Sequence, residues 1–498
     1  MRTKNLLLIL ALVVCTGLSA ETLTVTTNAA SGDGSLVAAI GLANDNDSII
    51  FDFDSETNEI LIEDVIVMKS IAINGINKAN DSRVIIKQIT AAKNFFTLAA
   101  GVVGRFYNII FDGSAGANKI CITAVNGSTI LIDNCVFKNI NSGTDNGGGA
   151  RLQGVIRIYN SLFENNTCSG TYGGGALCIY NAADAIIDKC TFVGNSSTGG
   201  ANRGGGAIVA RGTVATGPCK VLITNSTFAN NSSESRGGAL MSSVQTSTGT
   251  TYLADVTAIN CTFTGNKGNG AVAAYTNIKG TSILNLVNCL VTNNIDAAGT
   301  AYSDLIENVG EDPTGSAEVN VNNVIYSTAS ESIDTTGKNC IQVADPETAD
   351  IFNQALETFN TDKKRPVLTD TMGHKVAEIS NTSIAKNAGV ATLTGYTIPT
   401  DDQLGAIRPA TPAIGAVEYI VETNVSGVHD NPLKIMVRNN SISFNGLSGE
   451  QTLNVYAITG NLLHKIRVKN NEDVSLEHLL NKLLIVRVQN KSFKVLLK

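Results

Sequence analysis

The sequence predicts an all-β protein built mainly as a right-handed parallel β-helix. A motif, Asn-x-x-Phe or a near relative, recurs at steps of 26, 26, 29, 36, 35, 28 and 35 residues, as expected for a stacked repeat. Each unit holds short β-rich runs separated by Gly and Asn, and no unit shows a helical period. Proline is absent before Pro218, which suits strands that form hydrogen bonds along both edges.

Each part of the repeat predicts a place in a coil. We expect the Phe side chains to point inward and stack from coil to coil, with Gly-Gly-Gly-Ala at 173–176 and 204–207 making turns of positive φ. The clear copies pair Asn108 with Phe111, Asn134 with Phe137, Asn160 with Phe163, Asn225 with Phe228 and Asn260 with Phe263, and weaker copies pair Lys189 with Phe192, Asn288 with Val291 and Asn323 with Tyr326. The residue after the first position of the motif is small and should also face inward: Cys135, Ser161, Cys190, Ser226, Cys261 and Cys289. A second set of Asn residues should form an amide ladder at a bend: Asn166, Asn195, Asn231 and Asn266.

The N-terminus has the pattern of an export signal over residues 1–20. Arg2 and Lys4 precede a short apolar run, and Leu18-Ser19-Ala20 offers a cleavage site. A lipoprotein anchor on Cys15 is the alternative, but Val14 is not the small residue that such a site needs. No later segment has eighteen uninterrupted apolar residues, so no transmembrane helix is expected after the signal.

Charge is distributed unevenly along the chain. After removal of the signal the chain has 34 basic and 43 acidic side chains, net −9. Residues 431–498 hold ten Lys or Arg and four Asp or Glu, net +6, so residues 21–430 carry −15. The acidic body argues against a nucleic-acid partner. We therefore expect a β-helix over 21–420, a linker over 421–432 and a small C-terminal domain over 433–498.

The repeats resemble those of the chlamydial polymorphic outer-membrane proteins. The resemblance rests on FENN, FVGN, FANN and FTGN together with GGGAL at 173–177, GGGAI at 204–208 and GGAL at 237–240. Residues 23–53 are similar to the first coil of bacterial right-handed β-helix proteins of the pectin-lyase-like kind, with Leu36, Ile40 and Ala43 on one face of a short capping helix. Residues 407–419 (IRPATPAIGAVEY) resemble the closing coil of the same group.

The C-terminal region resembles the type A sorting domain of type IX secretion. The resemblance is carried by residues 453–468 (LNVYAITGNLLHKIRV) and 483–498 (LLIVRVQNKSFKVLLK). It implies export across the outer membrane by the type IX machinery, cleavage of the tail, and surface attachment or release. Alternation such as Ile442 and Phe444 predicts a small β-sandwich, and a structural cap or sugar-binding module is the alternative role.

The β-helix fold also carries pectate lyases and polygalacturonases, so the fold alone does not distinguish binding from catalysis. The four His residues are His374, His429, His464 and His478, which excludes a His base in the central coils. The acids of the Phe coils do not recur as a pair that could face one sugar bond: Asp133, Asp145, Glu164, Asp184, Asp188 and Glu234. Arginines near the Gly turns could line a basic groove or provide the base of a lyase whose acids hold Ca²⁺, but we expect them to be solvated loop charges: Arg151, Arg157, Arg203, Arg211 and Arg236. Tyr172 and Tyr180 could stack weakly on sugars.

The sequence therefore predicts a secreted or surface-attached adhesin or structural interaction protein with a glycan or cell-surface partner. A polysaccharide-processing enzyme, lyase or glycoside hydrolase, is the alternative. No catalytic, cofactor-binding or metal-binding residue is predicted, and no cofactor. The acid cluster Asp45, Asp47, Asp52 and Asp54 is expected to flank the first coil rather than bind Ca²⁺, and the nine cysteines of the mature chain are not expected to form a full disulfide framework.

Overall fold

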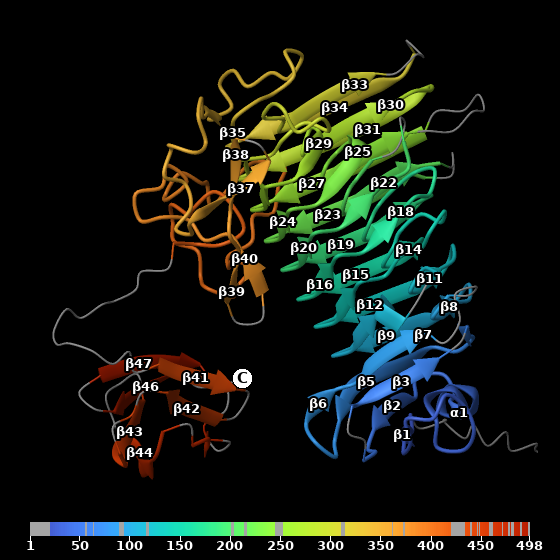
Figure 1. The fold of residues 1–498 in the computed structure, drawn as a ribbon, viewed down its shortest axis with the longest axis vertical. Helices are drawn as coiled ribbons and strands as arrows, with labels where there is room; N and C mark the ends of the chain where they lie inside the picture. The colour runs from blue at the N-terminus through green and yellow to red at the C-terminus, as the bar shows by residue number, and fades with distance from the viewer. Residues whose placement is uncertain are drawn as a thin grey trace, which may run out of the picture. The chain divides into compact units, whose positions relative to one another are not determined.

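The computed structural model contains two compact units, one ending at residue 421 and one beginning at residue 422. Each unit is considered by itself. Figure 1 shows the strands of the first unit stacked coil upon coil, from blue to yellow. The structure describes residues 20–54, 57–62, 64–88, 94–115, 119–200, 204–213, 217–244, 252–309, 314–360, 362–371, 374–419, 434–438, 441–445, 447, 449–457, 462–470, 472–476, 479, 483–488 and 491–496.

The first unit is a parallel β-helix of about nine turns, which confirms the predicted fold. Three long parallel sheets, here called A, B and C, run along it. Sheet A contains β1 (Thr22–Val25), β2 (Ser48–Phe51), β5 (Ile71–Asn77), β9 (Val103–Tyr107), β12 (Thr129–Asp133), β15 (Val155–Tyr159), β19 (Asp184–Asp188), β23 (Cys219–Thr224), β27 (Tyr252–Ile259), β31 (Gly280–Val287) and β34 (Ser316–Asn322), with β6 (Ser82–Arg83) beside β5.

Sheets B and C complete each coil, and a short sheet D lies between them in the later coils. Sheet B contains β3 (Glu59–Ile62), β7 (Ile85–Gln88), β10 (Ile110–Asp112), β13 (Val136–Lys138), β16 (Leu162–Glu164), β20 (Thr191–Val193), β24 (Thr227–Ala229), β28 (Thr262–Thr264), β32 (Leu290–Thr292), β35 (Ile325–Tyr326) and β36 (Ile341–Gln342). Sheet C contains β4 (Val65–Val67), β8 (Phe96–Leu98), β11 (Ile122–Ala124), β14 (Ala150–Leu152), β18 (Leu177–Tyr180), β22 (Ile208–Gly212), β26 (Leu240–Val244), β30 (Val272–Thr276) and β33 (Leu305–Val309). Sheet D contains β17 (Thr167–Cys168), β21 (Ser196–Ser197), β25 (Ser232–Arg236) and β29 (Lys267–Asn269), and the 3-10 helix η1 (Gly113–Ala115) follows β10.

The repeated Phe side chains form the predicted ladder inside the helix. The rings of Phe137, Phe163, Phe192 and Phe228 are fully buried, with centroids 4.7–4.8 Å apart and planes within 7° of parallel. This separation matches the spacing of neighbouring strands, so each ring lies directly over the one before it. The small residues after the motif's first position are buried as predicted. Burial raises the pKa of the Cys135 thiol to about 12, as expected for an inert core thiol.

The second set of Asn residues forms the predicted amide ladder. The Asn195 Oδ1 accepts hydrogen bonds from the backbone N (3.0 Å) and Nδ2 (2.9 Å) of Asn166, and the Asn195 Nδ2 donates to the Phe163 carbonyl at 2.9 Å. The same pattern repeats through Asn231 and Asn266 to Asn294, which the sequence analysis did not include. All these side chains are buried, so the ladder satisfies polar groups that would otherwise face the core.

Two left-handed residues shape the turns of each coil. The first Asn of the motif, or Lys189 in its place, has φ between 46° and 58° and turns the chain from sheet A into sheet B. A second such residue follows sheet B, for example Asn165 (φ 54°) and Gly194 (φ 67°). Asn and Gly tolerate this conformation better than other residues, which explains why the third residue is Asn in FENN and Gly in FVGN. The sequence analysis did not assign this role to the first Asn.

The helix α1 (Leu36–Leu42) covers the first coil, as predicted. Ser35 caps its N-terminus, because the Ser35 Oγ accepts a hydrogen bond from the Ala38 backbone N at 3.2 Å. Leu36, Ile40 and Ala43 are buried in the core that they close. The carboxylate of Asp47 accepts from the backbone N of Glu21 (2.8 Å) and Asn44 (2.7 Å), in keeping with a turn-flanking role.

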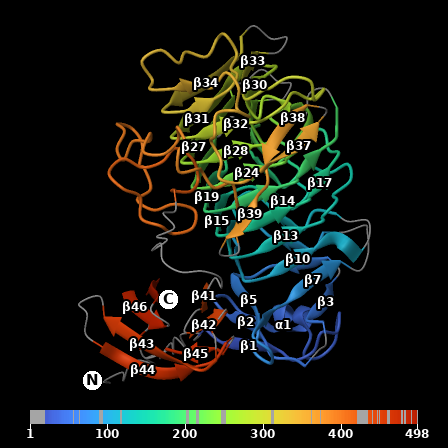
Figure 2. The same ribbon diagram turned by 60° about the vertical axis from the view of Figure 1, so that its left-hand side comes forward.

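Residues 343–419 run back along the outer face of sheet B, seen in orange in Figure 2. They include β37 (Leu356–Asn360), β38 (Lys363–Pro366), β39 (Thr369–Thr371) and β40 (His374–Val376). An apolar cluster joins this segment to Leu290 and Ile325 of sheet B. The motif at 407–419 therefore does not add a last coil; it lies beside coils already formed.

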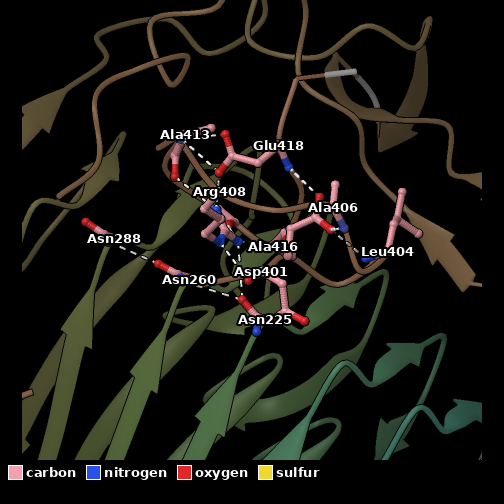
Figure 3. A network of polar contacts seen from close by, with 12 residues as sticks. Asn225, Asn260, Asn288, Asp401, Leu404, Ala406, Arg408, Ala413, Ala416 and Glu418 are labelled. Carbon is pink, nitrogen blue, oxygen red and sulfur yellow. Dashed lines mark hydrogen bonds and ion pairs between the residues drawn. The ribbon is translucent and has the colours of Figure 1, made fainter. Parts of the chain in front are cut away.

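A buried ion pair fixes the end of this segment (Figure 3). The Arg408 guanidinium pairs with Glu418 and donates to the Asn225 Oδ1 at 3.3 Å. The Gly415 backbone N donates to the Asn288 carbonyl at 2.9 Å, and the Ala416 backbone N to the Thr262 Oγ1 at 2.9 Å. The segment is thus held by hydrogen bonds to three successive coils.

The second unit is the predicted small β-sandwich. Ile442, Phe444 and Val455 are among the fully buried residues of its apolar core, and the rings of Phe444 and Phe493 lie 5.9 Å apart. One antiparallel sheet contains β41 (Lys434–Arg438), β42 (Ser441–Asn445) and β45 (Val474–Ser475), and the other contains β44 (Leu462–Val468), β43 (Gln451–Ala457), β46 (Leu483–Val488) and β47 (Lys491–Leu496).

Candidate functional site

The outer face of sheet C is open to solvent in the first coils of the β-helix and buried in the later ones. One row of outward positions reads Ile66, Thr97, Thr123, Arg151, Cys178, Val209 and Met241 from coil to coil. The first four side chains are exposed or half-buried, and the last three are buried. Arg151 therefore stands at the boundary between an open polar surface and a covered apolar one.

The cover over the later coils comes from the Gly-rich turns and the loops before them. A Cβ atom on Gly204 would lie 2.3 Å from the Met241 Sδ, so the turn passes directly over this side chain. The Arg236 guanidinium lies over the Tyr275 ring, 4.1 Å from its centroid. Among the described residues, the strands of sheet D begin at β17, and an isolated bridge joins Thr167 of β17 to Asn141 of the preceding coil.

A polar pocket of about 400 Å³ opens on the uncovered side of this boundary. The Lys119 Nζ pairs with the Asp145 Oδ2 at 2.9 Å, and the Asn94 Nδ2 donates to the Thr123 Oγ1 at 3.2 Å. The pocket thus offers a cation, hydroxyl and amide groups, and carboxylates within one small space. Its lining residues are Asp64, Asn94, Lys119, Ile120, Thr123, Asp145 and Arg151.

Arg151 is the cationic side chain best placed to meet a ligand in this pocket. Its guanidinium lies 4.8 Å from the centroid of the Tyr180 ring, which supports it from behind. Its Nε atom is buried without a hydrogen-bond partner, and no ion pair involves Arg151 in the described part of the chain. Tyr180 is itself positioned by a hydrogen bond from the Gln153 Nε2 to its hydroxyl.

The arginines near the Gly turns differ from one another. Arg211 is buried, with its Cζ 3.2 Å from the Tyr172 ring centroid, and burial lowers the pKa of its guanidinium. The expectation of a solvated loop charge is therefore wrong for Arg211, because the loop that carries Tyr172 folds over it. Arg157 instead lies on the outer face of sheet A and pairs with Asp184 at 3.0 Å. Arg203 lies outside the described residues.

Among the candidate acids, only Asp145 shares a described pocket with a candidate arginine. Asp184 pairs with Arg157, and Glu164 pairs with Lys375 of the returning segment. Asp133 accepts from the Asn160 Nδ2 at 2.8 Å, and Asp188 accepts from the Thr224 Oγ1 at 2.6 Å. Glu234 is exposed. Asp133, Asp184 and Asp188 lie on the outer face of sheet A, each with its own partner, whereas Glu164 lies on sheet B and Glu234 on sheet D, so these carboxylates do not form a common site.

Histidines and cysteines form no site in the described ranges. Burial and the nearby Lys189 lower the pKa of His374, and His429 and His478 lie outside those ranges. The cysteines that the structure describes are free thiols, and no three His, Cys, Asp or Glu side chains gather there as metal ligands. In the same residues, no helix has the length and apolar character needed to cross a bilayer.

No protein-family model and no curated protein matches this chain. The pocket therefore has to be interpreted from its own chemistry. Sequence reasoning missed Asp64, Asn94, Lys119 and Thr123 because they lie outside the Phe motif. A usable signal was present for Thr123, which occupies the repeat position that Arg151 and Cys178 occupy in the following coils.

Proposed function

We propose that this is an extracellular β-helix protein that binds a polysaccharide containing uronic acid in the pocket of Asp145 and Arg151. The observation that carries the proposal is the half-buried Arg151 at the wall of an open polar pocket, where it makes no ion pair among the described residues. A guanidinium in such a position is suited to a planar carboxylate, which it can bind through two parallel hydrogen bonds.

The other lining groups suit the rest of a sugar ring. Carboxylate oxygens accept hydrogen bonds from sugar hydroxyls, and Lys119, Asn94 and Thr123 can donate to ring and hydroxyl oxygens. The positive charge of Lys119 is balanced by Asp145, so Arg151 is the cation of the lining that can bind the carboxylate of an acidic sugar, and Asp64 brings the formal net charge of the lining to zero. The open outer row continues from the pocket through the earlier coils at Thr123, Thr97 and Ile66, which gives a polymer ligand room to extend in that direction.

Calorimetric titration of the mature protein with oligogalacturonate, its methyl ester and a neutral oligosaccharide tests this proposal. We expect the free acid to bind and Arg151→Ala to weaken binding by about tenfold or more. Arg151→Lys should restore part of the affinity. Arg157→Ala is the matched control, because it removes the same charge from the outer face of sheet A. Equal binding of acid and ester, or an unchanged affinity in Arg151→Ala, would contradict the proposal.

Catalysis on the bound polymer is the second candidate function. A lyase could use Arg151 as its base, with Asp64 and Asp145 holding Ca²⁺ at the substrate carboxylate. Release of unsaturated sugar ends in the presence of Ca²⁺, abolished by Arg151→Lys, would assign a lyase. Binding without release of product would leave the protein an adhesin or interaction protein.

We also propose that residues 433–498 direct export by the type IX machinery, so that the protein is secreted or held at the cell surface. The separate apolar core of the β-sandwich and its net charge of +6 against a body of −15 support an independent module. A chain ending at residue 421 should keep its β-sheet circular dichroism and remain in the periplasm. Residues 422–498 fused to another exported protein should carry that protein outside. Surface display of the shortened chain would exclude this role.

A further inference from the structure

A second pocket, of about 350 Å³, lies on the outer face of sheet A, away from the Arg151 pocket on sheet C. Two segments distant in sequence form it. Strands β19, β23 and β27 provide the floor, and the turn at 393–397 provides a wall, placed beside them in Figure 2. Its volume falls at the lower end of the roughly 300–1,000 Å³ range of small-molecule sites.

The turn that carries Tyr396 is fixed in place. The Tyr396 backbone N donates to the Leu393 carbonyl at 3.1 Å, and Gly395 has a φ of 89° that closes the turn. Leu393, Tyr396 and Ile398 pack with Ile259 of sheet A in one apolar cluster. The Tyr396 ring is therefore held at the pocket wall and remains half-buried.

The floor of the pocket combines apolar and charged rows. Ile186 and Leu222 are outward-facing neighbours in successive coils, and Ile259 lies beside them. One step along the strands, Asp184, Lys220 and Asp255 occupy a single row. Asp184 pairs with Arg157, whereas no ion pair involves Lys220 in the described residues. The Asp255 Oδ1 accepts a long hydrogen bond, 3.4 Å, from the Asn285 Nδ2.

We infer that this pocket binds one unit of a neutral oligosaccharide. A pyranose ring presents an apolar C–H face, which suits Tyr396 and the aliphatic floor, and an edge of hydroxyl groups. Asp255 can accept from two adjacent hydroxyls and Lys220 can donate to a hydroxyl or ring oxygen. Arg157 neutralises Asp184, Lys220 and Asp255 carry opposite charges, and the lining contains no guanidinium that could bind a sugar carboxylate, so the pocket favours neutral sugars. The two pockets therefore differ in the sugars they select.

Calorimetric titration of the mature protein with cello-, manno- and malto-oligosaccharides tests the inference. We expect at least one series to bind, and Tyr396→Ala to weaken its binding by about tenfold through loss of stacking. Tyr396→Phe should retain most of the affinity. Asp255→Asn keeps the shape of the pocket and should weaken binding severalfold.

Tyr159→Ala is the matched control, because Tyr159 lies on the same face of sheet A but does not line the pocket. It should leave the affinity unchanged. The inference is overturned if no neutral oligosaccharide binds, or if Tyr396→Ala binds as tightly as the wild type. If neutral sugars do not bind but uronate binding still depends on Arg151, this inference fails and the proposed function stands. The two proposals can therefore fail independently.

Discussion

The first coils and the later coils of the β-helix pack their aromatic side chains differently. In the first coils, Phe96, Phe106 and Phe111 meet edge to face, with planes 64–79° apart. In the later coils, neighbouring rings from Phe137 to Phe228 lie within 7° of parallel. Where the repeat is regular, identical side chains occupy the same position one strand spacing apart, and stacking follows. Phe96, Phe106 and Phe111 instead come from sheets C, A and B of one coil, and rings that meet from different positions adopt the edge-to-face arrangement that isolated aromatic groups also prefer.

The same division appears on the outside of the molecule. The later coils carry the Gly turns and sheet D, which bury the outer row at Cys178, Val209 and Met241. Among the described residues of the first coils, no such Gly turn and no strand of sheet D precedes Thr97 or Thr123, and these two side chains stay half-buried. Regular repeats thus provide a rigid, covered stack, and the polar pocket lies at its open boundary.

The largest expected effect is the removal of one ring from the regular stack. Phe192→Ala should lower the free energy of unfolding by roughly 3–5 kcal/mol, because it leaves a cavity between Phe163 and Phe228. Chemical denaturation measures this change. Phe359→Ala, at a half-buried position on β37, should have a much smaller effect. An unchanged unfolding midpoint for Phe192→Ala would mean that the stack does not stabilise the later coils.

The end of the Asn ladder should make stability depend on pH. The Asp304 carboxylate accepts from the Asn294 Nδ2 (2.8 Å) and from the backbone N of Ser327 (2.6 Å) and Thr328 (3.1 Å). Burial nevertheless raises its pKa from 3.8 to about 7, although these hydrogen bonds oppose the shift. Between these pH values the folded protein holds a proton that the unfolded chain has lost. The contribution of Asp304 to stability is therefore greatest below about pH 4 and falls as the pH rises to about 7.

Comparing the wild type with Asp304→Asn isolates this contribution from that of other acids. The difference between the two free energies of unfolding should change by a few kcal/mol between pH 4 and pH 8. Above pH 7 it should become constant. A difference that is the same at every pH would show that Asp304 titrates normally.

A break within the Asn ladder should have a somewhat smaller effect. Asn231→Ala removes the acceptor for the Asn195 backbone N and Nδ2, and leaves the Phe192 carbonyl without its side-chain donor. We expect a loss of roughly 2–3 kcal/mol, because these groups remain buried. Asn320→Ala, which removes an exposed amide from β34, is the control and should be nearly neutral. Equal losses in the two variants would show that burial does not strengthen the ladder.

The parts of the fold that recur in the sequence could be predicted from it. A Phe, Cys or Asn that recurs at one position of the coil lies beside the same residue type in the next coil. The ladder positions of Phe192 and Asn195 could therefore be predicted from the spacing of the repeat. The cap formed by Leu36 and Ile40 followed from the need to close an open stack. These predictions required no knowledge of how distant segments meet.

The candidate site could not be predicted in the same way. Irregular loops bring Lys119 of the preceding coil and Asp145 of the same coil beside Arg151, and Tyr172 covers Arg211 through the path of a single loop. The position of Tyr396 depends on a return segment whose contacts span more than one hundred residues, as in the hydrogen bond from the Asn288 Nδ2 to the Val390 carbonyl. Such contacts do not recur at a fixed spacing, so the sequence contains no repeat pattern from which to predict them.

The smallest expected effect concerns the left-handed turn between sheets A and B. Asn160 has a φ of 48°, and its side chain donates to the Asp133 Oδ1 at an exposed position. Asn160→Ala should lose about 1 kcal/mol, because a Cβ without a local hydrogen bond disfavours this conformation. Asn160→Gly should be nearly neutral, since Gly reaches the same φ without strain. The comparison separates the backbone from the side chain: if both variants lose the same stability, the hydrogen bond to Asp133 stabilises the turn. If only the alanine variant does, the motif's first Asn is retained for its conformation.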